Sequence, residues 1–280
     1  MNAADQSLPL PHSFEYAGQQ VRYGVMGDGP ALVLVHGTPF SSQVWRRIAP
    51  LLATQYRVHY FDLLGYGQSE MAQGQDVSLG VQNGLLAGLI EHWGLDEPHL
   101  VAHDFGGATA LRCLILNQID YATLTLIDPV AIAPWGSPFV QHVRQHQQAF
   151  SGLPGYIHQT VVAAYIQGAV YQPMLDSDLM HYLKPWLGEG GQDAFYRQIA
   201  QMDQRYTDEV QSAYDSIEFP VLLIWGEQDQ WIPVDRGMEL AQKIRNCQMV
   251  RVPNAGHLVQ EDAPEAIIAA LLRFLHSQSG

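Results

Sequence analysis

One stretch of the sequence decides the fold, and it reads Leu100-Val101-Ala102-His103-Asp104-Phe105-Gly106-Gly107-Ala108-Thr109-Ala110-Leu111-Arg112. An apolar run ends at His103 and Asp104, two glycines follow, and an Ala- and Leu-rich segment begins after them. This pattern predicts a buried strand, a very tight turn and a helix. The Asp104 side chain is then expected at the helix N-terminus, where backbone N–H groups favour negative charge.

Two interpretations of Asp104 are open at this point. Asp is a common helix N-cap, so Asp104 is an ordinary cap in the first interpretation. In the second it is a nucleophile, because a carboxyl with a reference pKa of about 3.9 is already an anion at neutral pH. A carboxylate is suited to displacement at a saturated carbon. The product is an ester on the protein, which water then hydrolyses by attack on the carboxyl carbon of Asp104.

Composition limits the classes of protein to which the chain can belong. Its 280 residues, 47% of them hydrophobic, suffice for one large domain with an inserted subdomain. The formal net charge of -14 argues against nucleic acids and anionic membranes as partners. No apolar run approaches the roughly 18–20 residues that span a bilayer, and the first residues lack the pattern of a secretory signal. With only two cysteines, Cys113 and Cys247, a cytoplasmic location is expected.

Strand and helix patterns alternate on both sides of a different middle segment. Strands are predicted over residues 13–18, 21–26, 31–35, 56–61, 100–103, 122–127, 221–225 and 248–252. One helix is predicted to begin after a cap at Ser41 or Ser42 and to include residues 44–52. Further helices are predicted over residues 78–93, 236–244 and 264–276, with several short helices between 130 and 217. Alternation of this kind is typical of a mostly parallel sheet covered by helices.

Three chemically competent residues follow predicted strands, in the order Asp104, Asp229 and His257. An earlier strand ends in the sequence His-Gly-Thr-Pro-Phe at residues 36–40. The order nucleophile, acid, histidine is that of the α/β-hydrolases, in which the tight turn usually carries a serine. The whole chain therefore resembles the α/β-hydrolase fold family. With Asp104 in place of serine, it is similar to the epoxide hydrolase and haloalkane dehalogenase branch.

The resemblance implies a mechanism with no metal and no organic cofactor. Asp104 attacks the substrate carbon, and His257, oriented by Asp229, activates the water that cleaves the ester. Asp128 is an alternative orienting acid, because it also ends a strand and one dehalogenase branch places its acid there. We prefer Asp229, since the sequence G-E-x-D-x-W-I-P matches the usual position of the acid.

The resemblance also implies a domain organisation. Residues 1–129 and 218–280 form the α/β core, and residues 130–217 form a helical cap over the site. The backbone N–H groups of Thr38 and Phe105 form the oxyanion hole.

Two residues bear on the choice between epoxide and halide chemistry. Haloalkane dehalogenases typically carry Trp after the nucleophile and Asn in the oxyanion loop, or a Trp from the cap, to hold the departing halide. Here the first two positions are Phe105, which has no donor, and Thr38, a weaker one. Trp135 or Trp186 is a candidate for the missing donor.

Epoxide hydrolases have the loop motif H-G-x-P, which residues 36–39 match, and use two cap tyrosines to hold the epoxide oxygen. By their distance along the chain from Asp104 and Asp229, Tyr156 and Tyr196 are the best candidates. We therefore expect an epoxide hydrolase acting on a small, neutral, largely apolar organic molecule, with haloalkane dehalogenase as the alternative.

Two further interpretations concern a metal site and a ligand-binding protein without catalytic activity. His142 and His146 are spaced to hold a metal on one helix face, but without a nearby third ligand they are expected to be solvated. A protein that keeps the fold but only binds ligands is the remaining alternative, and the intact set of Asp104, Asp229 and His257 argues against it.

Overall fold

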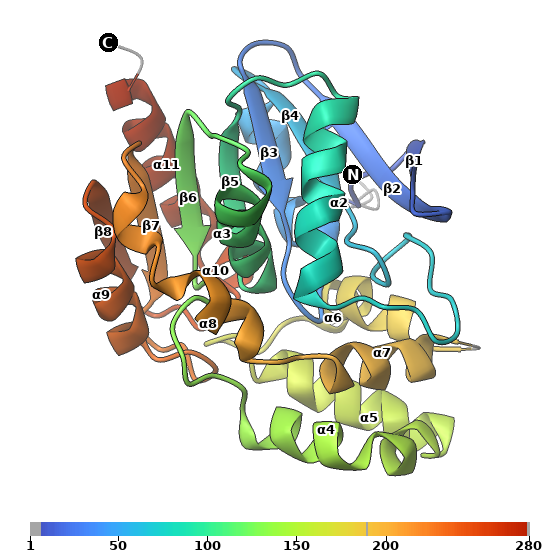
Figure 1. The fold of residues 1–280 in the computed structure, drawn as a ribbon. Helices are drawn as coiled ribbons and strands as arrows, with labels where there is room; N and C mark the ends of the chain where they lie inside the picture. The colour runs from blue at the N-terminus through green and yellow to red at the C-terminus, as the bar shows by residue number, and fades with distance from the viewer. Residues whose placement is uncertain (1–6, 189, 279–280) are drawn as a thin grey trace, which may run out of the picture.

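A single eight-stranded sheet forms the centre of the molecule in the computed structural model, which describes residues 7–188 and 190–278 (Figure 1). The strand order is β1-β2-β4-β3-β5-β6-β7-β8. β2 pairs antiparallel with β1 and β4, and the remaining neighbours are parallel. The strands span β1 His12–Tyr16, β2 Gln19–Met26, β3 Ala31–Val35, β4 Arg57–Phe61, β5 His99–His103, β6 Thr123–Ile127, β7 Val221–Gly226 and β8 Cys247–Val252.

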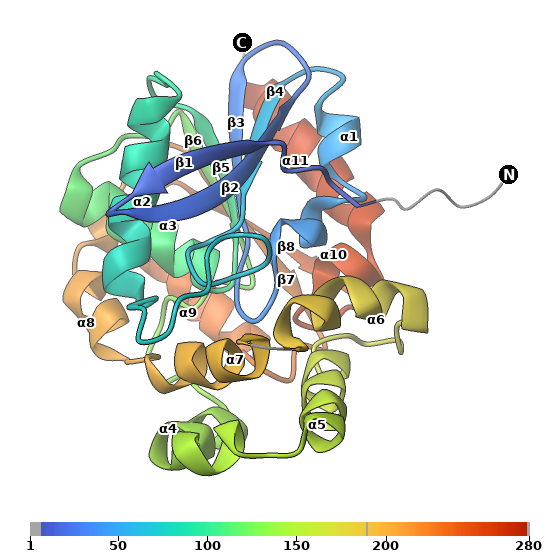
Figure 2. The same ribbon diagram turned by 90° about the vertical axis from the view of Figure 1, so that its right-hand side faces the viewer.

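Helices cover both faces of the sheet. α2 and α3 lie on one face, and α1 and α11 lie on the other (Figure 2). The core helices are α1 Ala49–Leu52, α2 Leu79–His92, α3 Phe105–Asn117, α9 Val234–Lys243, α10 Val259–Asp262 and α11 Pro264–Gln278. β6 and β7 are buried along their whole length, as expected for strands covered on two sides.

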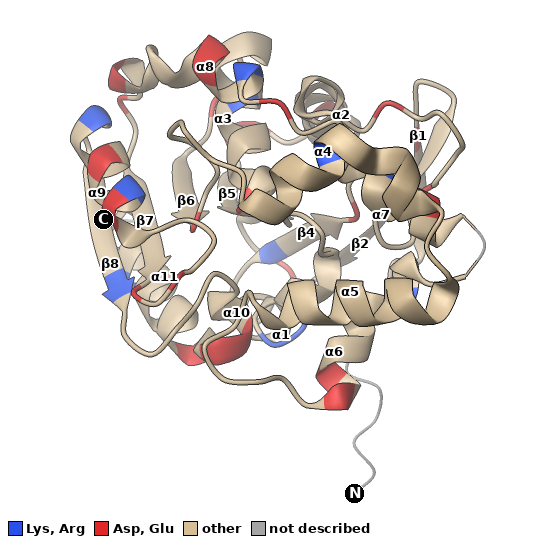
Figure 3. Cartoon of the chain, turned by 90° about the horizontal axis from the view of Figure 1, so that it is seen from below, with Lys and Arg blue, Asp and Glu red and all other residues tan. Residues whose placement is uncertain are grey.

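A helical segment, residues 130–188 and 190–217, connects β6 to β7. It lies below the carboxyl ends of the parallel strands in Figure 1. Its helices are α4 Pro138–Ser151, α5 Gly155–Gln167, α6 Asp176–Leu183, α7 Gly191–Ala200 and α8 Arg205–Gln211, with 3-10 turns η2 Lys184–Trp186 and η3 Tyr214–Ser216. Seen from below, α5 carries no Lys, Arg, Asp or Glu (Figure 3). The mostly parallel sheet, with helices on both faces and a helical segment between β6 and β7, confirms the predicted fold class.

The single helix predicted to run from a cap at Ser41 or Ser42 through residue 52 is the clearest local error, although Ser41 does cap the first turn. The structure has a 3-10 turn, η1 Ser42–Trp45, followed by the separate short helix α1. The cause is Pro50, which has no N–H and would leave a gap in a continuous helix. A new helix that begins at residue 49 places Pro50 in the first turn, where the N–H is not needed.

The described helices also bear on membrane insertion. Within residues 7–188 and 190–278, none of them combines the length and the apolar character needed to cross a bilayer.

Candidate active site

Asp104 lies at the corner between β5 and α3, with backbone angles φ 53° and ψ -119°. This conformation is unfavourable for a residue with a side chain and is typical of functional sites. The surrounding glycines make the corner possible. A Cβ at Gly106 would lie 2.5 Å from the carbonyl oxygen of Val35, and a Cβ at Gly37 would collide with the Asp104 side chain. The sequence thus fixes a carboxylate at the carboxyl edge of the sheet.

His257 is fully buried between two carboxylates. Its Nδ1 donates to Oδ2 of Asp229 at 2.8 Å, and its Nε2 lies 3.2 Å from Oδ2 of Asp104. The Asp229 carboxylate is held in turn by its Oδ1, which accepts from the backbone N–H groups of Trp231 at 2.7 Å and Ile232 at 2.9 Å. The structure therefore brings together the three residues whose order along the chain suggested a catalytic triad.

The electrostatics of this group favour a charged pair at rest. Burial acts to lower the pKa of His257, but the charges of Asp229 and Asp104 raise it well above its ordinary value. Burial acts to raise the pKa of Asp104, and the contact with His257 overcomes this and lowers it. At neutral pH Asp104 is thus a carboxylate beside an imidazolium.

Backbone N–H groups interact with the Asp104 carboxylate. Thr38 N–H donates to Oδ1 at 2.7 Å, and the Phe105 N–H also lowers the pKa of Asp104. These are the two N–H groups predicted for the oxyanion hole. The Thr38 hydroxyl is turned elsewhere, because it donates to Oε1 of Gln198 at 2.7 Å.

Asp128, the alternative acid, lies behind this group. It is fully buried, and its Oδ1 accepts from the backbone N–H of Gly226 at 2.9 Å. Burial, together with the charge of Asp229, raises the pKa of Asp128 well above its ordinary value. Asp128 is thus held by the backbone of β7, and it is Asp229 that accepts the hydrogen bond from His257 Nδ1.

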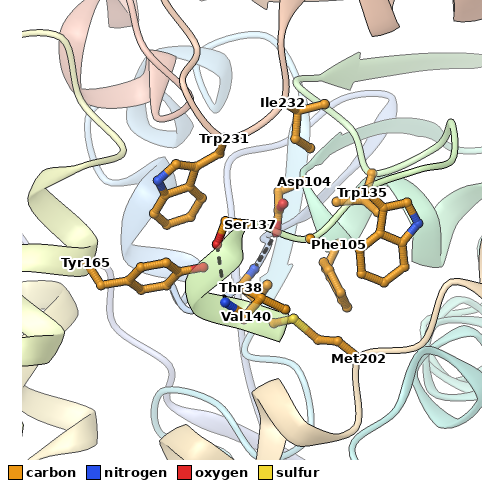
Figure 4. A pocket seen from close by; sticks show the side chains of 12 residues that line it. Thr38, Asp104, Phe105, Trp135, Ser137, Val140, Tyr165, Met202, Trp231 and Ile232 are labelled. Atoms are coloured by element: carbon orange, nitrogen blue, oxygen red, sulfur yellow. Dashed lines mark hydrogen bonds between the residues drawn. The ribbon is translucent and has the colours of Figure 1, made fainter. Parts of the chain in front are cut away.

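A small cavity of about 40 Å³ opens in front of Asp104 (Figure 4). Its walls are mainly apolar and aromatic, and among the described lining residues there is no Lys or Arg. The lining residues are Thr38, Asp104, Phe105, Val130, Trp135, Gly136, Ser137, Val140, Tyr165, Met202, Trp231 and Ile232. Such walls favour an uncharged, apolar molecule.

The structure corrects the predicted tyrosines. Tyr156 is 74% exposed, and the buried Tyr196 hydroxyl lies 3.0 Å from Nδ1 of His158, so neither reaches the cavity. Tyr165 does reach it, and its hydroxyl points toward Ser137 and Thr38 in Figure 4. Tyr156 and Tyr165 are nine positions apart on α5, about two and a half turns, so they face opposite ways.

The helical periodicity of α5 is the signal that identifies Tyr165. Val162 and Ile166 are both fully buried, and Tyr165 lies on their side of the helix. Among the described residues its hydroxyl has no hydrogen-bond partner. Its ring stacks on Trp231 at 4.5 Å, and Trp231 lies 4.9 Å from the ring of His257. Sequence reasoning missed the role of Trp231, although it belongs to the quoted motif around Asp229.

The two tryptophans considered as halide donors form hydrogen bonds to other protein atoms with their indole N–H groups. Trp135 lines the cavity, but its Nε1 donates to Oγ1 of Thr207 at 2.9 Å. Trp186 donates to the carbonyl oxygen of Pro39 at 2.8 Å. The N–H of Trp231 points away from Asp104 in Figure 4. The described cavity walls therefore present no indole N–H to a leaving halide.

The two histidines considered as a metal pair lie next to each other on α4 with their rings edge to face. The centroids of His142 and His146 are 4.7 Å apart. In the part of the chain that the structure describes, no group of three or more His, Cys, Asp or Glu side chains is arranged to hold a metal ion.

Residues 32–270 match the family model described as the alpha/beta hydrolase family. The chain belongs to the alpha/beta hydrolase family.

Other members of this family and fold are similar over most of this chain. An alpha/beta hydrolase fold protein from Burkholderia ambifaria is 56% identical, with a TM-score of 0.93 and coverage of 95% of this chain and 98% of that chain. A dihydrolipoyllysine-residue acetyltransferase component of an acetoin cleaving system from Pseudomonas putida is 30% identical, over 97% of this chain and 71% of its own length. A 2-hydroxy-6-oxononadienedioate/2-hydroxy-6-oxononatrienedioate hydrolase from the same organism is 25% identical over 91% of each chain. This chain is accordingly a hydrolase of the α/β fold.

Proposed function

We propose that this α/β hydrolase opens small, neutral epoxides through a covalent ester on Asp104. The observation that carries the proposal is a carboxylate, at the position of the family's nucleophile, that faces both His257 and the Tyr165 hydroxyl across one apolar cavity. A serine there would act on carbonyl carbons, whereas a carboxylate is suited to a saturated carbon.

In the first step Oδ2 of Asp104 attacks an epoxide carbon, and the carbon–oxygen bond of the ring breaks. The Tyr165 hydroxyl protonates the oxygen that is released. Burial raises the pKa of Tyr165, and the charge of Asp104 raises it further, so that the hydroxyl is protonated and available as a donor. Once Asp104 is a neutral ester, the imidazolium of His257 has lost one counterion. Its pKa falls, and its proton restores the Tyr165 hydroxyl.

In the second step water adds to the carboxyl carbon of Asp104, and the neutral His257 takes its proton. Negative charge develops on Oδ1, to which the Thr38 N–H donates, and the Phe105 N–H also acts on this carboxyl. As the intermediate collapses, the ester bond to the substrate carbon's oxygen breaks, and the departing alkoxide takes the proton of the added hydroxyl. The diol leaves, Asp104 is again a carboxylate, and His257 is the imidazolium formed when it took the proton of water. Asp229 holds the imidazole in the required orientation throughout.

Two other substrate classes fit the cavity less well. A haloalkane would require a donor for the departing halide, and the indole N–H groups near the cavity are turned away or occupied. A dioate, the substrate class in the name of the Pseudomonas putida hydrolase, would require cations, and the described lining contains no Lys or Arg.

A product assay tests the proposed function. The protein is incubated with mixed epoxides and mixed haloalkanes, and the products are read as diol and as free halide. We expect diol, and we expect its formation to require Asp104. Halide release that depends on Asp104 would identify a dehalogenase, and no Asp104-dependent product of either kind would indicate a binding protein.

Replacement of Tyr165 tests the proposed proton donor. A Tyr165→Phe variant is expected to open epoxides more slowly by roughly 2–4 kcal/mol of activation free energy, because a donor at a developing alkoxide is lost. The rate of ester formation in a single turnover measures this. Tyr156→Phe on the exposed side of the same helix is the matched control, with the parent rate expected. Parent rates in both variants would remove Tyr165 from the mechanism.

The pH dependence of ester formation tests the resting charge pair. The pKa of Asp104 lies below its ordinary value because of His257, so ester formation in the parent should persist into acid solution. It should be lost only as the pH falls through this lowered pKa. In a His257→Gln variant burial remains and the favourable contact is gone, so the pKa rises and the loss should begin at a higher pH. Identical pH profiles for the parent and the His257→Gln variant, measured in quenched single-turnover assays, would contradict the charge pair.

A further inference from the structure

Gln198 joins the helical segment to the loop that contacts Asp104. It lies on α7 and is 3% exposed. Its Oε1 accepts two hydrogen bonds, from the Thr38 hydroxyl at 2.7 Å and from the Tyr66 hydroxyl at 3.1 Å. The N–H of the same Thr38 donates to Oδ1 of Asp104 at 2.7 Å. One amide oxygen from α7 thus holds the residue whose N–H contacts the nucleophile.

Stability alone does not account for this amide. The Nε2 of Gln198 is buried and has no hydrogen-bond partner among the described residues. A buried donor without a partner is unfavourable, and an apolar side chain of similar length would avoid that loss. The contribution of Gln198 is its Oε1, which accepts hydrogen bonds from the hydroxyls of Thr38 and Tyr66.

A second side chain of the helical segment contacts the same loop. Nε1 of Trp186 donates to the carbonyl oxygen of Pro39 at 2.8 Å. Adjacent loop residues, Thr38 and Pro39, are therefore both held from the helical segment. This matters because loops are the mobile parts of a fold, and catalytic donors need a fixed position.

We infer that Gln198 is a positioning residue for hydrolysis of the ester, which it assists by holding the Thr38 N–H at Oδ1 of Asp104. This inference rests on the proposed function. Oδ1 gains negative charge when water adds to the ester, so a misplaced Thr38 N–H weakens this step most. During ester formation the carboxylate loses charge, so that step depends less on the donor.

A Gln198→Met variant tests the inference, because methionine has similar length and no strong acceptor. Loss of an oxyanion donor costs about 10²–10³-fold in rate, and a displaced donor is expected to cost about 10-fold. We expect the ester to decay about 10-fold more slowly in a single turnover. Under steady-state conditions kcat and KM should fall together while kcat/KM is retained, and mass spectrometry should detect ester. A fall in kcat/KM as large as that in kcat would indicate a merely structural role and overturn the inference.

Two further variants control the experiment. Gln201 is also a glutamine between the helical segment and the core, but it contacts Val77 N–H at 2.7 Å and the Gln75 carbonyl at 2.8 Å, away from the Thr38 loop. Gln201→Met should retain parent kinetics. Thr38→Val removes the same hydrogen bond from the other partner and keeps the backbone N–H. Its effect on ester decay should match that of Gln198→Met, and the double variant should add little. Additive effects would contradict the inference.

A spectroscopic measurement separates this inference from the proposed function. In an NMR spectrum of protein labelled with 15N-threonine, the Thr38 amide proton should resonate downfield because it is hydrogen-bonded to the Asp104 carboxylate. The Gln198→Met variant should shift it upfield, and Gln201→Met should not. An unmoved signal would overturn the inference whatever the reaction. A moved signal without an ester in the His257→Gln variant would overturn the proposed function alone.

Discussion

An Asp104→Ala variant is expected to lose turnover by a factor on the order of 10⁴ to 10⁶ and to keep its fold. The large loss is expected because the covalent route begins at this carboxylate. Among the described residues that line the cavity, no other carries a carboxyl group. The fold should persist because Asp104 makes its interactions at the edge of the sheet, and because His257 keeps Asp229 as its buried partner after the change. Diol formation and thermal unfolding are the two measurements.

The matched control is Asp215→Ala, a change of the same kind at an exposed position in η3. It should turn over at the parent rate. An Asp104→Ala variant that retains parent turnover would remove Asp104 from the role of nucleophile, and His257 would then act as a base on water directly.

A His257→Gln variant is expected to stop after one chemical step and to accumulate an ester. Alkylation of a carboxylate needs no base, but hydrolysis of the ester needs a water that a neutral imidazole activates. Intact-protein mass spectrometry should show an increment equal to the whole mass of an epoxide, since ring opening expels no atoms. With a haloalkane the increment would lack the halogen, so its size identifies the reaction.

The position of the ester completes this test. The increment should map to the peptide that contains His103, Asp104 and Phe105, and it should be absent from a variant that also carries Asp104→Ala. An unmodified His257→Gln protein, with substrates that the parent consumes, would exclude the covalent route.

The core of the site could be predicted from the sequence because its residues depend on local pattern. The glycines after Asp104, and the positions of Asp229 and His257 after later strands, bring these side chains to one edge whenever the strands are parallel. Residues that are far apart along the chain are therefore close together at this edge of the sheet. The backbone donors of Thr38 and Phe105 were expected from the resemblance to the α/β-hydrolases and not from the pattern of strands.

The helical segment was less predictable because its contacts depend on packing rather than on pattern. Distance along the chain suggested Tyr156 and Tyr196, whereas the direction in which α5 faces the core selects Tyr165. The hydrogen bond between Thr38 and Gln198 joins residues 160 positions apart, and no spacing rule indicates it. The sequence therefore predicted the meeting of Asp104, Asp229 and His257, and the prediction was wrong for Tyr156 and Tyr196.

The insertion point of the helical segment has a consequence for how such proteins diverge. The segment leaves and re-enters the sheet at β6 and β7, which are adjacent paired strands, so its length and sequence can change without altering the register of any strand. Seven of the lining residues belong to it, namely Val130, Trp135, Gly136, Ser137, Val140, Tyr165 and Met202. Much of the surface that contacts the substrate can therefore change within one contiguous stretch of the chain, while the reacting groups Asp104, Asp229 and His257 lie outside that stretch.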